Sequence, residues 1–338
     1  MDGVPIAFWT HLCDMSLPCD VTEAKELLGP FGELAETAFH YMLQYVTVVE
    51  EGIEKRPYLY FWCTERRVRA SEEIGSVPKK FVRGVTINFK DARPENVSRE
   101  LIQRFPHAFP NFVFLCPSIS EAWVDFACSL KRSIDVRITK KLEDESVGLL
   151  QRLVDARKLS TIMVHEEDCE VLSNEVWGFF RRPWEGGVVR ELLHFWSQNS
   201  DKLKGKRLVL SEECERGVKQ LEEFLLRNSS SSFGLLLRMT MFIAPYFVVH
   251  RVLKVCSKEK CDAINKEYRH NYRRFHKPSC VYKFEEGEGS ERRRLYISFE
   301  CATLIEQITG RPKLSASHTG LDKLWRMRAT TLLQVLFA

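Results

Sequence analysis

The chain has 338 residues, of which 44% are hydrophobic and 28% charged, and its formal net charge at pH 7 is +4. This composition is typical of folded globular proteins, so it excludes a disordered chain, a collagen-like repeat and a small disulfide-stapled domain. The positive charge is local, because the segment 250–277 carries nine Lys or Arg residues against three acidic ones.

Cysteine usage and the N-terminal residues both predict an intracellular protein, cytoplasmic or nuclear. The eleven cysteines are odd in number and scattered, unlike a disulfide framework. The first residues lack the cationic region of a secretory signal. The most apolar stretch, 233–249, contains Arg238 and Pro245 and is shorter than the ~20 residues of a spanning helix, so we expect a buried core element and no membrane partner.

Helical periodicity with two interruptions predicts a small three-helix unit in residues 1–45. Apolar residues share one helical face from Phe8 to Leu12, a second pattern covers 21–28, and Gly29-Pro30 ends it before a third helix over 34–43. Residues 46–80 are expected to form a β-hairpin around Gly52, followed by a polar linker over 65–80.

Residues 81–228 alternate between short apolar runs and stretches of helical period. The runs recur about every 24 residues, a spacing found in leucine-rich-repeat-like β–α units, and they cover 85–88, 112–115, 134–139, 160–164, 188–193 and 207–210. Stacking such units produces a parallel sheet. Ser118 and Glu121 have the spacing of a capping box at one helix start.

The remaining segment, 229–338, is expected to contain the apolar element, a basic helix, a hairpin of 280–284 with 293–299, and a short helical tail. The predicted fold class is therefore α+β or α/β. It combines a small N-terminal three-helix unit with an irregular leucine-rich-repeat-like β–α body.

Catalytic signatures are missing from the sequence, including phosphate-binding glycine loops, nucleophile elbows and paired-histidine metal motifs. His165 and the acidic residues that follow it are expected to form a loop after a strand. His194, between two apolar residues, is expected to be a core histidine. We therefore predict a protein that is not an enzyme and needs no cofactor.

The basic segment has two functional interpretations besides an ordinary core-facing helix. Aromatic residues interleave with cations there, so it is a candidate nucleic-acid contact through Arg269, Arg273 and Arg274. It is also a candidate structural zinc site, although its spacings depart from tight zinc knuckles, with the ligands Cys256, Cys261, His270, His276 and Cys280.

A second candidate surface is an aromatic and basic segment before Gly186-Gly187. Clustered Trp and Arg are favoured in protein interfaces, and the residues concerned are Trp177, Arg181, Arg182 and Trp184. Buried packing at a helix end is the alternative for each aromatic residue.

The segments 4–8 and 27–35 together resemble a degenerate F-box, and the chain resembles the F-box-like proteins of nematodes. Pro5 and Phe31 match the F-box pattern. The resemblance implies that the N-terminal helices dock on the small adaptor subunit of a cullin–RING ubiquitin ligase, with the contact residues Pro5, Phe8, Leu12, Leu27 and Phe31. The body would then capture a substrate protein and tether it near the ligase.

Overall fold

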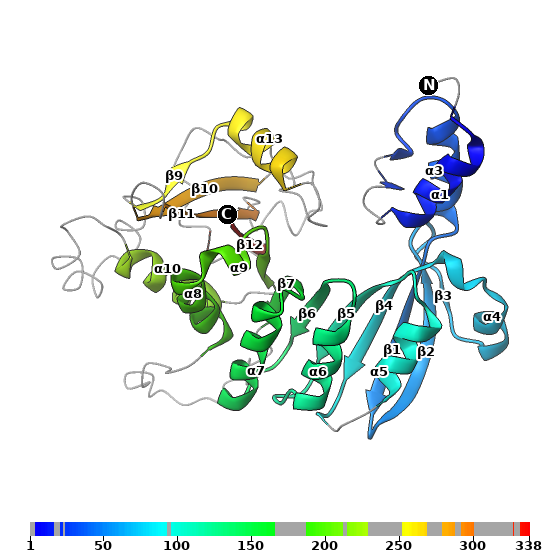
Figure 1. The fold of residues 1–338 in the computed structure, drawn as a ribbon, viewed down its shortest axis with the longest axis horizontal. Helices are drawn as coiled ribbons and strands as arrows, with labels where there is room; N and C mark the ends of the chain where they lie inside the picture. The colour runs from blue at the N-terminus through cyan, green and yellow to red at the C-terminus, as the bar shows by residue number, and fades with distance from the viewer. Residues whose placement is uncertain are drawn as a thin grey trace, which may run out of the picture. The chain divides into compact units, whose positions relative to one another are not determined.

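The computed structural model describes residues 4–16, 21–22, 24–92, 96–165, 187–211, 215–228, 252–268, 279–287, 292–300, 327 and 332–338. Its fold is mixed α/β, with twelve strands in these residues (Figure 1). The chain divides into two compact units, Met1–Asp135 and Val136–Ala338.

The first unit begins with two helices and continues into a mainly parallel sheet. The sheet order is β3–β2–β1–β4–β5, in which β1 pairs antiparallel with β2 and parallel with β4. Figure 1 shows α5 and α6 in front of these strands. The elements are α1 (Ile6–Met15), α3 (Pro30–His40), β1 (Leu43–Glu50), β2 (Ile53–Phe61), β3 (Arg67–Val68), α4 (Ser71–Ser76), η1 (Lys79–Phe81), β4 (Val82–Phe89), α5 (Val97–Arg104), β5 (Phe109–Phe114) and α6 (Glu121–Ser129).

The second unit continues the β–α alternation and then changes to antiparallel pairing. Its strand order is β6–β7–β8–β12–β11–β10–β9, and the unit boundary falls inside β6. Strand β8 is parallel to β7 and antiparallel to β12. The elements are β6 (Ile134–Ile138), α7 (Asp144–Asp155), β7 (Leu159–His165), α8 (Val188–Gln198), α9 (Ser200–Leu203), β8 (Arg207–Ser211), α10 (Glu215–Arg227), β9 (Lys254–Val255), α13 (Lys258–Glu267), β10 (Ser279–Glu286), β11 (Arg293–Glu300) and β12 (Leu332–Phe337).

Buried aromatic rings form much of the core of both units. In the first unit, the Trp123 ring of α6 packs edge-on against Phe114 of β5, with the ring centroids 4.7 Å apart. In the second, the fully buried Trp196 of α8 contacts Phe224 of α10 and Phe337 of β12. Helices and strands are therefore joined by large apolar contacts, which carry most of the stabilisation of a fold of this kind.

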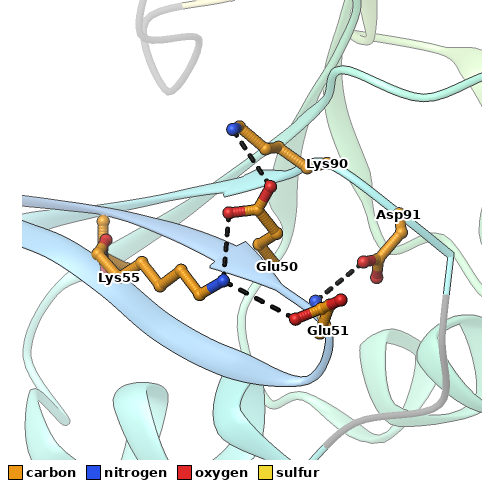
Figure 2. A network of polar contacts seen from close by, with 6 residues as sticks. Glu50, Glu51, Lys55, Lys90 and Asp91 are labelled. Atoms are coloured by element: carbon orange, nitrogen blue, oxygen red, sulfur yellow. Dashed lines mark hydrogen bonds and ion pairs between the residues drawn. The ribbon is translucent and has the colours of Figure 1, made fainter.

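A polar network closes the β1–β2 turn against the end of β4 (Figure 2). Glu51 and Gly52 both have positive φ, as two-residue hairpin turns require. The Glu51 N–H donates to Asp91 at 2.7 Å, while Lys55 and Lys90 each approach Glu50 at 3.2 Å. Hydrogen bonds from Lys90 and Lys55 lower the pKa of the Glu50 carboxyl. The network is exposed, so it contributes little to stability but defines where the hairpin ends.

Five of the six predicted strand runs in 81–228 are strands, and the hairpins of 46–62 and 280–299 are confirmed. The strand predicted over 188–193 is wrong, because these residues form the first part of helix α8. Val189, Leu192 and Leu193 are buried together with Trp196, which is the spacing of one helical face rather than of a strand.

The predicted helical boundaries in 1–45 also need correction. Pro30 does not stop a helix but occupies the first turn of α3, where its missing N–H costs nothing. The helix predicted over 34–43 is α3, which begins at Pro30 and ends at His40, and Leu43 already belongs to β1. In 21–28 only Val21, Thr22 and Ala24 have helical geometry among the described residues, so the structure does not confirm a three-helix unit.

Two further predictions are wrong at the level of single elements. The cap of α6 is Ser120, whose hydroxyl accepts from the Trp123 N–H at 3.2 Å, rather than Ser118. The end of the chain is strand β12 rather than a helical tail, because its apolar residues complete the pairing between β8 and β11.

Candidate partner-docking surface

The N-terminal helices have a small core of their own. Trp9 and Cys13, one turn apart on α1, face inward, and Cys13 is buried together with Val21, Ala35 and Met42. Phe31 and Phe39 pack against this cluster. The helices are thus held by apolar contacts on their inner side.

The same segment exposes an unusual number of large apolar side chains. The structure identifies eight exposed large hydrophobic residues in the part of the chain that it describes, and six of them lie within residues 4–28. We call these six the N-terminal apolar patch; with their exposed fractions they are Val4 (39%), Ile6 (67%), Phe8 (52%), Leu12 (38%), Leu27 (55%) and Leu28 (100%). Single exposed apolar residues are normal, but a concentration of them marks an interaction surface.

Gly32 fixes the position of the turn that carries Leu27 and Leu28. A Cβ atom added to Gly32 would overlap the Leu27 carbonyl oxygen, so only glycine allows α3 to approach this turn so closely. The Leu27 N–H donates to the Ala24 carbonyl at 3.0 Å. The start of α3 thus lies directly against the backbone of the turn in which Leu27 and Leu28 are exposed.

Arg83 of β4 attaches α1 to the sheet of the first unit. Its guanidinium donates to the Cys13 carbonyl at 3.3 Å, to the Asp14 carboxylate at 2.9 Å and to the Asp14 carbonyl. The side chain is only 6% exposed, and this burial lowers the pKa of Arg83 while the Asp14 charge opposes the shift. A cation at the C-terminus of α1 also complements the helix dipole. This contact positions the helix that carries Ile6, Phe8 and Leu12.

Four of the five residues predicted as partner contacts are exposed, namely Pro5, Phe8, Leu12 and Leu27. The fifth, Phe31, is half-buried, and its ring centroid lies 4.9 Å from that of Trp9. Sequence reasoning missed Ile6 and Leu28, the most exposed members of the patch. The sequence did contain a signal for their exposure. Ile6 follows Pro5 at the start of a helix and Leu28 precedes the Gly29-Pro30 turn, and side chains at such places are often left uncovered.

Several other candidate residues lie outside the residues that the structure describes. This applies to the aromatic and basic candidates Trp177, Arg181, Arg182 and Trp184, to the nucleic-acid candidates Arg269, Arg273 and Arg274, and to the zinc candidates His270 and His276. Cys280 lies in β10.

Cys256 and Cys261, the remaining zinc candidates, are core residues. Both are buried in a cluster with Ile264, Tyr268 and Tyr296. Burial raises the pKa of the Cys256 thiol, and burial with a smaller contribution from Cys256 raises the pKa of Cys261 to about 11. The described residues contain no group of three or more His, Cys, Asp or Glu side chains that could hold a metal ion.

The buried thiol of Cys261 predicts a loss of stability in alkaline solution. The thiol ionises near 9.0 when unfolded and near 11 when folded, so the unfolded state gains stability as the pH rises through this window. The expected contribution is about 2–3 kcal/mol lost between pH 9 and 11. Urea unfolding of Cys261→Ala should show a shallower decline than the wild type over this range, with Cys63→Ala as the control. Equal slopes would contradict the prediction.

The two histidines singled out in the sequence have different environments. His165 is the last residue of β7 and is buried, so its expected place in a loop after the strand is wrong, and the acidic residues 166–168 lie outside the described residues. His194 is exposed on α8, with its ring 3.1 Å from the Gln198 amide, so the expectation of a core histidine is wrong. Successive side chains of a helix point about 100° apart. Leu193 and Phe195 therefore reach the buried side of α8, whereas His194 points to its exposed side.

No helix in the described ranges has the length and apolar character needed to cross a membrane, and the stretch 233–249 lies outside them. Compared with known proteins, the chain matches no family model, no curated protein and no solved structure.

Proposed function

We propose that this chain is a non-catalytic, intracellular adaptor, whose F-box-like N-terminal unit docks on the small adaptor subunit of a cullin–RING ubiquitin ligase. The observation that carries the proposal is the N-terminal apolar patch, where six of the eight exposed large hydrophobic residues of the described chain gather in 4–28. The resemblance of 4–8 and 27–35 to an F-box names the partner.

The arrangement of the patch suits docking rather than folding. Cys13, Val21 and Ala35 already close the inner side of the helical unit, so the patch residues are not needed for its own core. Burying apolar surface on a partner gains about 25 cal/mol per Å², which favours association of an exposed patch of this kind. Arg83 already fixes α1 on the sheet, so binding of a partner costs little conformational entropy in this helix.

The body supports the second half of the proposal. In the second unit, the helices α7, α8 and α10 alternate with strands and bury apolar side chains such as Leu153, Leu193 and Leu221. A protein that carries a docking unit and a separate binding body acts by raising the effective concentration of substrate at the ligase. No bond-making step is required of this chain.

The proposal is tested by measuring the affinity of the purified full chain for the purified ligase adaptor subunit by isothermal titration calorimetry. We expect a saturable complex with one copy of each protein and a negative heat-capacity change, because apolar surface is buried. Mass spectrometry of subunits that co-purify from cells should then recover the cullin together with that adaptor. The absence of binding by the folded full chain would refute the proposal.

A further inference from the structure

A cavity of about 450 Å³ lies between α7, α8 and β7 in the second unit. We call it the α7–α8 groove. Its floor is apolar and includes the buried side chains of Val154, Ile162 and Leu192. Its size falls in the range of ligand-binding clefts in proteins, which are apolar with a few polar groups at the edge.

The rim of the groove is acidic. Asp144 lies in the first turn of α7 and Glu191 in the first turn of α8, and both are exposed. Within the described ranges, no Lys or Arg forms an ion pair with either carboxylate. The positive end of each helix dipole favours a negative charge at such a position. The rim therefore offers two charges that complement a cationic ligand, although the chain as a whole is positively charged.

Gly148 leaves the groove open. It lies inside α7, although glycine is the least favourable helix residue after proline. A Cβ added there would meet no atom within 4 Å, so neither close packing nor backbone conformation requires glycine at this position. The space that a larger side chain would fill belongs to the groove, since Gly148 lines it.

We propose that the α7–α8 groove binds a segment of a partner polypeptide in which a large apolar side chain is flanked by Lys or Arg. The apolar side chain enters between the helices above Ile162, and the flanking cations pair with Asp144 and Glu191. Calling this partner the recruited substrate rests on the proposed function; binding of such a segment does not.

The test uses the purified full chain and three fluorescein-labelled peptides of twelve residues. Each contains a central Leu-Phe pair, flanked on both sides by Lys and Arg, by Ser, or by Glu. Fluorescence anisotropy should show at least tenfold tighter binding of the cationic peptide than of the serine peptide, with the glutamate peptide weakest. This order is opposite to the one that the net charge of the chain would give.

Two variants and one control test whether the binding is in the groove. Gly148→Leu should weaken the cationic peptide at least tenfold by filling the space, while Gly148→Ala should unfold at a temperature no lower than that of the wild type, which shows that α7 tolerates a side chain there. Asp144→Lys combined with Glu191→Lys should reverse the order, so that the glutamate peptide binds best.

Three results would each overturn this inference: equal binding of the three peptides by the wild type, undiminished binding by Gly148→Leu, or an unchanged order after the charge reversal. The peptide assay contains no ligase adaptor subunit, so its outcome is independent of adaptor docking. A failure of adaptor docking together with the expected peptide order would therefore reject the proposed function and leave the groove assignment intact.

Discussion

Replacing Phe8 and Leu28 together by Asp should weaken binding of the full chain to the ligase adaptor subunit at least a hundredfold. The two side chains are 52% and 100% exposed, so the folded monomer loses little when they change. In a complex, each buried apolar side chain contributes about 1.5–3 kcal/mol, and a carboxylate placed in that interface must also be desolvated. A hundredfold change corresponds to about 2.7 kcal/mol, which is below the sum expected for both residues.

The matched control for this pair is Ile53→Asp. Ile53 is 58% exposed, comparable to Phe8, but it lies at the start of β2 and outside the N-terminal apolar patch. Calorimetric titration should give wild-type affinity for Ile53→Asp, and urea unfolding should place all variants within about 1 kcal/mol of the wild type. Equal loss of binding in the control, or undiminished binding in the double variant, would show that the patch is not the docking surface.

Removal of the Asp14 side chain should destabilise the first unit by about 1–3 kcal/mol, because Asp14→Ala leaves the buried Arg83 cation without its counter-charge, while the 36% exposure of Asp14 reduces the effect below that of a fully buried pair. Arg83 is 6% exposed and reaches the Asp14 carboxylate at 2.9 Å. The variant should therefore unfold at lower urea concentration, and α1 should lose its attachment to β4 before the rest of the unit unfolds.

A double-mutant cycle separates this charge effect from lost packing. Adding Arg83→Met removes the buried cation, so Asp14→Ala with Arg83→Met should be more stable than Asp14→Ala alone. Urea unfolding followed by tryptophan fluorescence measures all four proteins, since Trp9 lies on α1. If the double variant is less stable than Asp14→Ala, the pair does not act through charge neutralisation.

The sequence predicted those elements whose pattern is local. Alternating residues such as Val46 and Tyr58 identified the first hairpin, and short β-branched or apolar runs identified β4 to β8. Helix α8 was missed because its opening valines favour a strand, whereas the helical spacing of Leu192 and Trp196 is apparent only over the full eleven residues. Strand β12 pairs with segments far away in sequence, and no local pattern reports such pairing.

The candidate docking surface was predicted only in part for a different reason. Pro5, Phe8, Leu12 and Leu27 were found from their place in a motif. Exposure of Ile6 and Leu28 depends on which neighbours fail to cover them, and that is a property of the assembled helices. The α7–α8 groove could not be predicted from the sequence. Asp144 and Glu191 lie on two helices separated by a strand, and only the folded chain places both at the same cavity.

The position of β12 has a consequence for the newly synthesised chain. Strand β8 ends at Ser211, but β12, its antiparallel partner, begins only at Leu332. At ribosomal rates of about 5–20 residues per second, the edge of β8 stays open for on the order of 10 s. All five residues of β8 are buried in the final fold, and the central three, Leu208 to Leu210, are apolar, so a strand edge with an apolar centre is exposed during this interval. Binding of a chaperone to 207–211 during synthesis would protect the chain from aggregation until β12 arrives.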